Sequence, residues 1–287
     1  MFEIDRQKDF FVGIDSDGCA FDTMELKHKE CFIPNTIKYY GLQAISKYAR
    51  EAAEFVNLYS KSRGINRFPA LIETLEWLQR RPEVQTRNFE ITIPPSVQKW
   101  IEEESKLGNP ALQKLVETND DADLKLALDW SLKVNETVAN MVSNVPPFPL
   151  VRESLEKLHA QADMVVCSAT PNEALKAEWG EHGLDQFVVE ICGQESGSKK
   201  ETLANAAKYD PDKSLMIGDA PGDFKAAQHN QCLFYPINPG DEDASWKRFY
   251  EEGIDKFLDG SFAGDYQQQL LDEFEKYLPE MPPWKVV

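Results

Sequence analysis

The sequence lacks any apolar run approaching the roughly 20 residues that a membrane-spanning helix needs. No basic segment followed by an apolar stretch opens the chain, so we expect no signal peptide. Positive charge is also scarce: 31 Lys and Arg stand against 49 Asp and Glu among 287 residues, a formal net charge of -18. Because nucleic acids and anionic membranes are bound by clustered basic residues, we expect neither as a partner. An anionic substrate would need a metal ion or a few well-placed cations.

Cysteine is sparse, and no two cysteines stand in a C-x-x-C pair. The five are an odd number at wide spacing: Cys19, Cys31, Cys167, Cys192 and Cys232. This pattern fits neither a disulfide framework nor a thiolate zinc site. We therefore expect reduced thiols, several of them acting as small buried apolar residues, and a cytoplasmic protein.

The apolar pattern that is present begins with residues 10–14, a short run typical of a strand buried on both faces. It ends on Asp15, and Asp17 and Gly18 follow. From residue 23 to about 145 the apolar spacing is helical. From residue 146 onwards helices alternate with short apolar runs, which predict further strands at 163–168, 187–192, 214–219 and 232–237. This alternation predicts an α/β fold with a doubly wound, Rossmann-like parallel sheet.

The change of pattern predicts two domains. Residues 1–22 and 146–287 should form the catalytic core, and residues 23–145 a helical cap inserted after the first strand. Because the insert begins just after the acidic turn, we expect it to lie over the carboxyl ends of the strands. Within the insert, Pro34 should break the first helical run. Ser96 should be the N-cap of a helix that ends near residue 107, and residues 119–121 should start a long helix.

Polar residues follow four of the five predicted strands or open the helix after them. They are Asp15 and Asp17, then Ser168, then Lys199 or Lys200, then Asp219 and Asp223. Taken singly, each has an ordinary structural explanation as a cap, a turn or a solvated side chain. In a doubly wound sheet, however, the carboxyl ends of the strands share one edge, where ligands bind. We therefore expect these residues to converge. The four histidines are scattered away from the strand ends, and we assign them no catalysis.

Together these residues resemble the four motifs of the haloacid dehalogenase superfamily of aspartate-dependent phosphotransferases. The first motif, D-x-D-G-[TV], matches residues 15–19, except that Cys19 replaces the usual Thr or Val. The strand ending in Ser or Thr matches residues 164–168, and the lysine ahead of a helix matches Lys199. The last motif, G-D-x-x-x-D, matches residues 218–223. All four occur in family order.

The resemblance implies roles for these residues. Mg²⁺ would be held by Asp15, Asp219 and the backbone carbonyl of Asp17, with Asp223 in support. Asp15 would be the nucleophile that forms an aspartyl-phosphate, and Asp17 the general acid and base. Ser168 and Lys199 would bind the transferring phosphoryl oxygens. We favour Lys199 over Lys200, because family members place an apolar helix residue four positions after this lysine, as Leu203 is here.

The predicted function is that of a Mg²⁺-dependent phosphatase acting on a small phosphomonoester. A phosphomutase on the same core, or a non-catalytic metabolite-binding module, remains an alternative. A dehalogenase is disfavoured, because it has no leaving alkoxide for Asp17 to protonate. In the insert, Arg63 and Arg67 flank Gly64 and could bind the rest of the substrate. The alternative is a surface turn whose arginines pair with glutamates such as Glu73 or Glu76.

Overall fold

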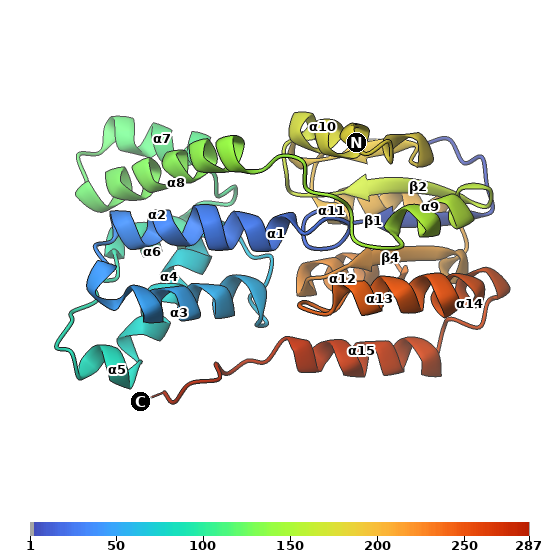
Figure 1. Cartoon of the computed structure of the whole chain (residues 1–287). Coiled ribbons are helices and arrows are strands. Elements are labelled where there is room, and N and C mark those ends of the chain that lie inside the picture. The colour runs from blue at the N-terminus through green and yellow to red at the C-terminus, as the bar shows by residue number, and fades with distance from the viewer. Residues whose placement is uncertain (1–2, 287) are drawn as a thin grey trace. The chain divides into compact units, whose positions relative to one another are not determined.

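The computed structural model describes residues 3–286 (Figure 1), which divide into two compact units. The core unit comprises residues 3–24 and 143–278, and the helical unit comprises residues 25–142 and 279–286. The chain therefore passes from one unit to the other three times. The first two passages lie within three residues of the domain boundaries that the sequence predicts. The third, at residue 279, has no counterpart in that prediction.

The core unit is built on a five-stranded parallel sheet with the strand order β3-β2-β1-β4-β5. The strands are β1 (Phe10–Ile14), β2 (Ala162–Cys167), β3 (Glu190–Cys192), β4 (Ser214–Gly218) and β5 (Leu233–Pro236). In the centre, Ile14 of β1 is in register with Val166 of β2 and with Ile217 of β4. The predicted α/β fold class is confirmed.

Successive residues of β1 enter different hydrophobic clusters, as expected for a strand covered on both faces. Val12 and Ile14 belong to one cluster of the core unit, and Phe11 belongs to another. All three side chains are fully buried. This two-sided burial is the reason that the strand reads as an uninterrupted apolar run in the sequence.

Helices connect and flank these strands (Figure 1). The α-helices are α9 (Val151–His159), α10 (Asn172–Glu181), α11 (Lys199–Leu203), α12 (Pro221–His229), α13 (Glu242–Arg248), α14 (Ile254–Asp259) and α15 (Asp265–Tyr277). The shorter elements are η3 (Asp185–Phe187), η4 (Gln194–Ser196), η5 (Ala204–Lys208), η6 (Pro211–Lys213) and the π-helix η7 (Phe249–Gly253). The predicted strand 187–192 is shorter than expected, because its first residue belongs to η3 and pairing begins only at Glu190.

The helical unit begins at the end of α1 and contains the helices up to α8. They are α1 (Thr23–Leu26), η1 (Lys27–Phe32), α2 (Ile33–Tyr39), η2 (Gln43–Ile45), α3 (Ser46–Leu58), α4 (Arg67–Gln79), α5 (Pro82–Gln85), α6 (Pro95–Glu103), α7 (Asn109–Thr118) and α8 (Ala122–Met141). Asp121 is the N-cap of α8 and accepts hydrogen bonds from the backbone N–H groups of Asp123 and Leu124. The predicted start of this long helix is therefore confirmed.

Two local predictions in the helical unit are wrong. The first helical run continues through Pro34, because the π-helix η1 precedes α2 and Pro34 falls in the first turn of α2. A π-helical turn changes the hydrogen-bond pattern at the point where a proline would otherwise interrupt it. Ser96 is not an N-cap, because α6 already begins at Pro95; its hydroxyl instead donates to the Asp121 carboxylate.

The segment after Leu278 returns to the helical unit. The ring of Trp284 packs edge-on against Phe55, with a centroid distance of 5.5 Å. The Arg81 guanidinium lies 4.5 Å from the centroid of the same indole. We call residues 279–286 the C-terminal strap. The sequence predicts that these residues belong to the catalytic core, whereas in the structure they belong to the helical unit.

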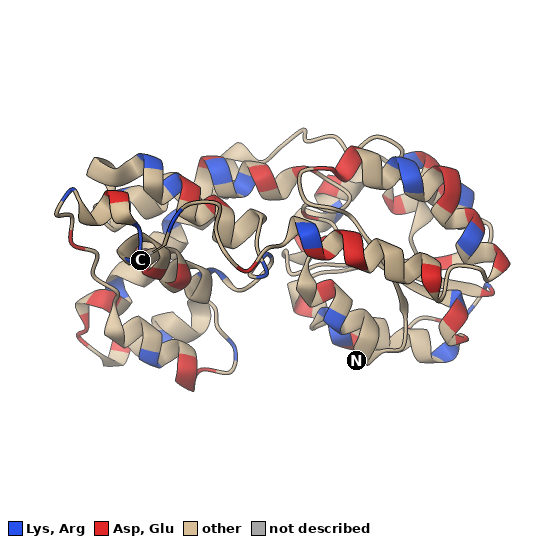
Figure 2. Cartoon of the chain, turned by 90° about the horizontal axis from the view of Figure 1, so that it is seen from below, with Lys and Arg blue, Asp and Glu red and all other residues tan. Residues whose placement is uncertain are grey.

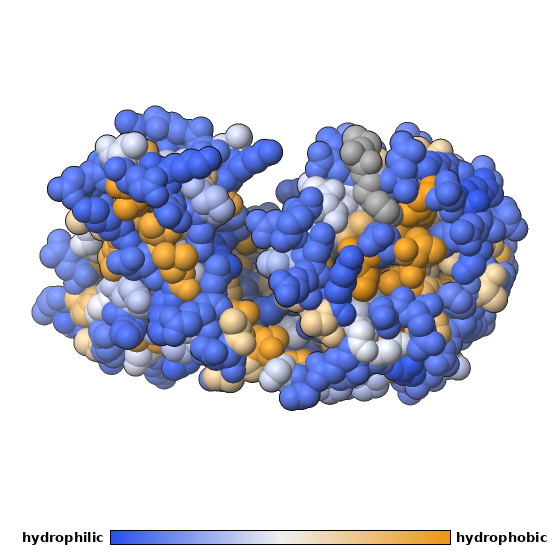
Figure 3. Space-filling model, turned by 90° about the horizontal axis from the view of Figure 1, so that it is seen from above, coloured by the Kyte–Doolittle hydropathy of each residue, from blue (hydrophilic) through white to orange (hydrophobic). Residues whose placement is uncertain are grey.

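The surface of both units is polar. Acidic and basic residues are interspersed along the helices (Figure 2), and the face in Figure 3 is largely hydrophilic, with smaller hydrophobic areas on each unit. Within residues 3–286, every helix is too short or too polar to span a lipid bilayer.

Candidate active site

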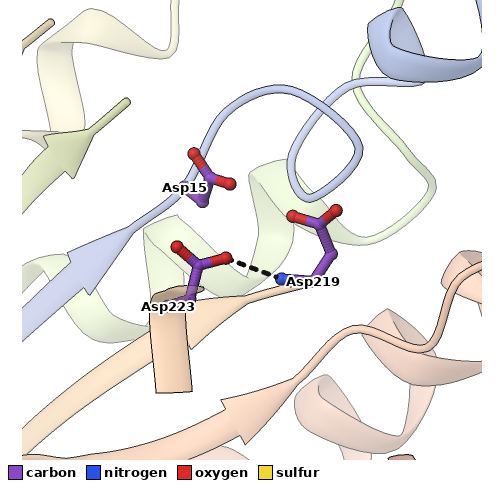
Figure 4. Close-up of side chains that lie close together, drawn as sticks. All are labelled: Asp15, Asp219 and Asp223. Carbon is purple, nitrogen blue, oxygen red and sulfur yellow. Dashed lines mark hydrogen bonds between the residues drawn. The ribbon is translucent and has the colours of Figure 1, made fainter. Parts of the chain in front are cut away.

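Three buried carboxylates meet at the carboxyl edge of the sheet (Figure 4). Asp15 follows β1, Asp219 follows the neighbouring strand β4, and Asp223 lies in the first turn of α12. One carboxylate oxygen from each lies within 4.8 Å of the others. The three residues are at most 5% exposed. The structure thus brings together the acids of the first and last predicted motifs.

Gly218 allows Asp223 to approach the end of β4. A Cβ atom at position 218 would lie 2.5 Å from the Cβ of Asp223, too close for two carbon atoms. Asp223 Oδ2 accepts hydrogen bonds from the backbone N–H groups of Asp219 (3.2 Å) and Ala220 (3.1 Å). In the G-D-x-x-x-D motif, α12 therefore begins almost directly after β4, and the second acid, in the first turn of the helix, lies beside the end of the strand.

Lys199 supplies positive charge to this acidic cluster. Its Nζ lies 2.7 Å from Asp15 Oδ2 and 2.5 Å from Asp223 Oδ1. Ser198 and Glu201 form a capping box that begins α11 directly before this lysine. Lys200, the other sequence candidate, is exposed. The structure therefore places Lys199, and not Lys200, against the acids.

Burial raises the pKa of Asp15 well above its ordinary value; Lys199 opposes this shift, and the charges of Asp223 and Asp219 reinforce it. The pKa of Asp223 is raised by burial in the same way. Burial alone would lower the pKa of Lys199, but Asp15 and Asp223 outweigh it and hold the pKa well above its usual range. One ammonium thus faces three carboxylates. An excess of buried negative charge on hard oxygen donors is the environment that a divalent cation such as Mg²⁺ fits.

Asp17 is not one of the three clustered carboxylates, and it accepts hydrogen bonds from two threonine hydroxyls. Thr170 donates to Asp17 Oδ2 at 2.6 Å, and Thr23 donates to Oδ1. Gly18 has a φ of +75°, a left-handed conformation that glycine adopts without strain, and it turns the chain directly after Asp17. Sequence reasoning missed both threonines; their only signal is proximity to the first two motifs.

Ser168 directly follows β2, the strand beside β1, and is 5% exposed. Its backbone N–H donates to the Cys192 carbonyl, and its hydroxyl accepts from the Thr170 N–H at 3.2 Å. Cys19, which departs from the family motif, is fully buried within the acidic turn, and burial raises the pKa of its thiol well above the usual range. The five cysteines are all free thiols.

The two predicted substrate arginines lie in the helical unit and have partners there. Arg63 is 2% exposed and donates to the Leu58 carbonyl at 2.8 Å. Arg67 donates to Ser131 Oγ (3.0 Å) and to Asn135 Oδ1 (2.7 Å). These contacts favour a structural role, and a role in substrate binding stays a prediction.

The comparison with protein families finds a model described as haloacid dehalogenase-like hydrolase, which matches residues 14–230. The matched segment contains every site residue named above and covers well over half of the 287 residues. The chain belongs to this hydrolase family. The resemblance carried by the four motifs is confirmed, and the chain is an enzyme of the hydrolase class.

Solved structures of similar proteins share little sequence with this chain. A putative phosphoglycolate phosphatase from Lactobacillus delbrueckii is 14% identical, with 93% of this chain and 99% of that chain covered and a TM-score of 0.49. A haloacid dehalogenase-like protein from Streptococcus pneumoniae is 12% identical, with 92% and 98% covered and a TM-score of 0.49. A putative β-phosphoglucomutase from Thermotoga maritima is 14% identical, with 86% and 99% covered and a TM-score of 0.49. A comparison with curated proteins finds no match.

Proposed function

We propose that this hydrolase is a Mg²⁺-dependent phosphatase that cleaves a small phosphomonoester through an aspartyl-phosphate on Asp15. The observation that carries the proposal is the contact of Lys199 with both Asp15 and Asp223, beside a third buried acid. Such a cluster is costly for folding, because it buries carboxylates that repel one another. It is well suited to a dianionic phosphoryl group and a divalent cation.

The residues that would hold Mg²⁺ are Asp15, Asp219 and Asp223, together with the Asp17 carbonyl that the family resemblance implies. Their oxygens are the hard ligands that this ion prefers. When bound, Mg²⁺ neutralises charge on the phosphoryl group, which otherwise repels an anionic nucleophile. In this proposal, Lys199 and the Ser168 hydroxyl bind the remaining phosphoryl oxygens.

Asp15 and Asp17 have different surroundings, which suits them to different tasks. Asp15 is buried at the strand end and accepts the N–H of Ser16 on Oδ1, so its carboxylate is held in one orientation. We assign it the attack on phosphorus, with the P–O bond to the leaving group breaking as the Asp15–phosphorus bond forms. Asp17 is less buried and lies two residues on. We assign it protonation of the departing alkoxide and, later, deprotonation of the attacking water.

The first experiment measures hydrolysis of p-nitrophenyl phosphate and of a panel of sugar, nucleotide and three-carbon phosphates with Mg²⁺ present. We expect turnover that EDTA abolishes and that Mg²⁺ restores. Asp15→Asn should fold and lose activity by several orders of magnitude. Full activity in EDTA, or an active Asn variant, would refute the mechanism. Isomerisation of a sugar phosphate without release of phosphate would instead establish the phosphomutase alternative.

A further inference from the structure

Ser16, the residue between the two acids of the first motif, is the junction of the acidic turn. Its backbone N–H donates to Asp15 Oδ1 at 2.8 Å. Its carbonyl accepts the N–H groups of the residues that close the turn, namely Cys19, Ala20 and Phe21, at 2.9–3.2 Å. The position of Ser16 therefore sets both the orientation of the Asp15 carboxylate and the course of the turn that carries Asp17.

The side chain of Ser16 is held by two consecutive residues of α10. The indole Nε1 of Trp179 donates to Ser16 Oγ at 2.9 Å, and Ser16 Oγ donates to Glu178 Oε2 at 3.0 Å. Ser16 and Trp179 are both fully buried. Trp179 also packs edge-on against Phe21, at the far end of the turn, with a centroid distance of 5.8 Å. One helix residue thus contacts both ends of the acidic turn.

The hydroxyl of Ser16 uses its donor and its acceptor capacity in these two bonds, so its rotamer is determined. A buried hydroxyl that bonds a carboxylate makes a stronger, charge-assisted hydrogen bond than one that bonds a neutral group. The second half of the turn has separate support, since Trp246 Nε1 donates to the Cys19 carbonyl at 2.7 Å. Loss of the Ser16 contacts should therefore loosen the segment between the two acids without unfolding the whole turn.

We propose that Trp179 and Glu178 are positioning residues that fix the two acids of the first motif through the side chain of Ser16. The proposal rests on the proposed function, in which Asp15 is the nucleophile and a metal ligand. It adds α10, a helix outside the four family motifs, to the parts of the molecule on which the reaction depends. A displacement of about 1 Å at a nucleophile can cost about 100-fold in rate.

The test compares Ser16→Ala, Trp179→Phe and Trp130→Phe. Trp130 is a matched control: it is buried in the helical unit and its indole donates to a threonine hydroxyl, Thr36 Oγ1, at 3.1 Å. Both Ser16→Ala and Trp179→Phe keep the backbone N–H bond from Ser16 to Asp15 but remove the side-chain contacts that fix this segment. They should therefore lower kcat for p-nitrophenyl phosphate about 10- to 100-fold, because a small displacement of the nucleophile is costly. KM should change much less. Trp130→Phe should leave kcat unchanged.

A second readout does not depend on turnover. Affinity for Mn²⁺ alone, measured by electron paramagnetic resonance, should fall in Ser16→Ala and Trp179→Phe and stay at the wild-type value in Trp130→Phe. A wild-type protein that binds Mn²⁺ but hydrolyses no phosphate ester would refute the proposed function. The Mn²⁺ affinities would still decide whether Trp179 and Glu178 position Asp15 through Ser16.

Two variants at Glu178 show whether its hydrogen bond or its charge matters. Glu178→Gln keeps an oxygen that can accept from Ser16 and should retain kcat within a few-fold, whereas Glu178→Leu should lose as much as Ser16→Ala. Melting temperatures of all variants identify losses that arise from unfolding. Wild-type kcat and Mn²⁺ affinity in Ser16→Ala would overturn the proposal. So would a Gln variant as impaired as the Leu variant, or losses that only follow the unfolded fraction.

Discussion

At the scale of single residues, the surroundings of Asp15 disfavour the charged form of its carboxyl group. Burial keeps its pKa above the ordinary value, so the folded protein takes up a proton at Asp15 more readily than the unfolded chain does. The free energy of unfolding therefore falls as pH rises from the unfolded-state pKa, about 4, through the raised pKa of the folded state. This is the cost of burying the Asp15 carboxylate, to which its two acidic neighbours add.

Asp15→Asn removes that cost, so without metal it should be more stable than the wild type at pH 7. Lys199 keeps its contact with Asp223, which prevents a new unpaired charge. We expect a higher melting temperature in EDTA, by about 2–4 °C for each kcal/mol relieved. The gain should shrink as pH falls toward about 4 and vanish below it, where Asp15 is protonated in both the folded and the unfolded state. Thermal unfolding of the two proteins between pH 4 and pH 7 measures this gain in melting temperature. A gain that grows toward low pH would contradict the explanation by burial of Asp15.

Asp17→Asn separates acid–base chemistry from simple charge. If Asp17 protonates the leaving group, its loss should cost about 10²–10⁴-fold on an alkyl phosphate. The loss on p-nitrophenyl phosphate should be smaller, because the phenolate leaves without much protonation. Steady-state kinetics on the two substrates make the comparison. Equal losses on both would count against the assignment.

At the scale of elements, the junction of β4 and α12 depends on the missing side chain of Gly218. Gly218→Ala would push Asp223 away from the strand end and should destabilise the fold by about 1–3 kcal/mol. The affinity of Gly218→Ala for Mn²⁺ should also fall, because Asp223 is displaced. Gly222→Ala is the matched control, because a Cβ at that position meets no atom within 4 Å. It should be neutral or stabilise by up to about 1 kcal/mol. Denaturant unfolding of the pair measures the difference, and similar values would contradict this explanation.

The core elements could be predicted from the sequence because their signals are local. A strand buried on both faces is a continuous apolar run, and the runs of β1, β2 and β4 each end next to a polar residue of a known motif. Contacts between distant segments leave no such trace. Nothing near Ser16 indicates that Trp179 contacts it from 163 residues away. Similarly, Arg63 reads as a flexible surface residue, although its side chain is buried against a helix end.

At the scale of the whole molecule, the C-terminal strap returns the chain to the helical unit. Trp284 makes an apolar contact there, packing edge-on against Phe55 with the Arg81 guanidinium over its ring. Trp284→Ala should destabilise the helical unit by about 1–3 kcal/mol. Met281→Ala, at a residue that is 57% exposed, should have little effect. Hydrogen exchange followed by mass spectrometry should show faster exchange in α3 and α5 for Trp284→Ala only. Unchanged exchange there would mean that the strap adds nothing to this unit.

The division into units also bears on how the active site is encoded. Its carboxylates, Ser168 and Lys199 come from the core unit, on both sides of an insert of more than a hundred residues. The sheet therefore carries the chemistry that we propose, and the helical unit carries no part of the acidic cluster.

The most direct test of the central claim is to trap the phosphorylated enzyme. Wild-type protein and Asp17→Asn are quenched with acid during turnover, treated with borohydride, which reduces an acyl phosphate to the alcohol, and digested for mass spectrometry. The account predicts homoserine in place of Asp15, formed only when substrate and Mg²⁺ are both present and absent from Asp15→Asn. Homoserine at another aspartate, or turnover by Asp15→Asn at the wild-type rate, would contradict it.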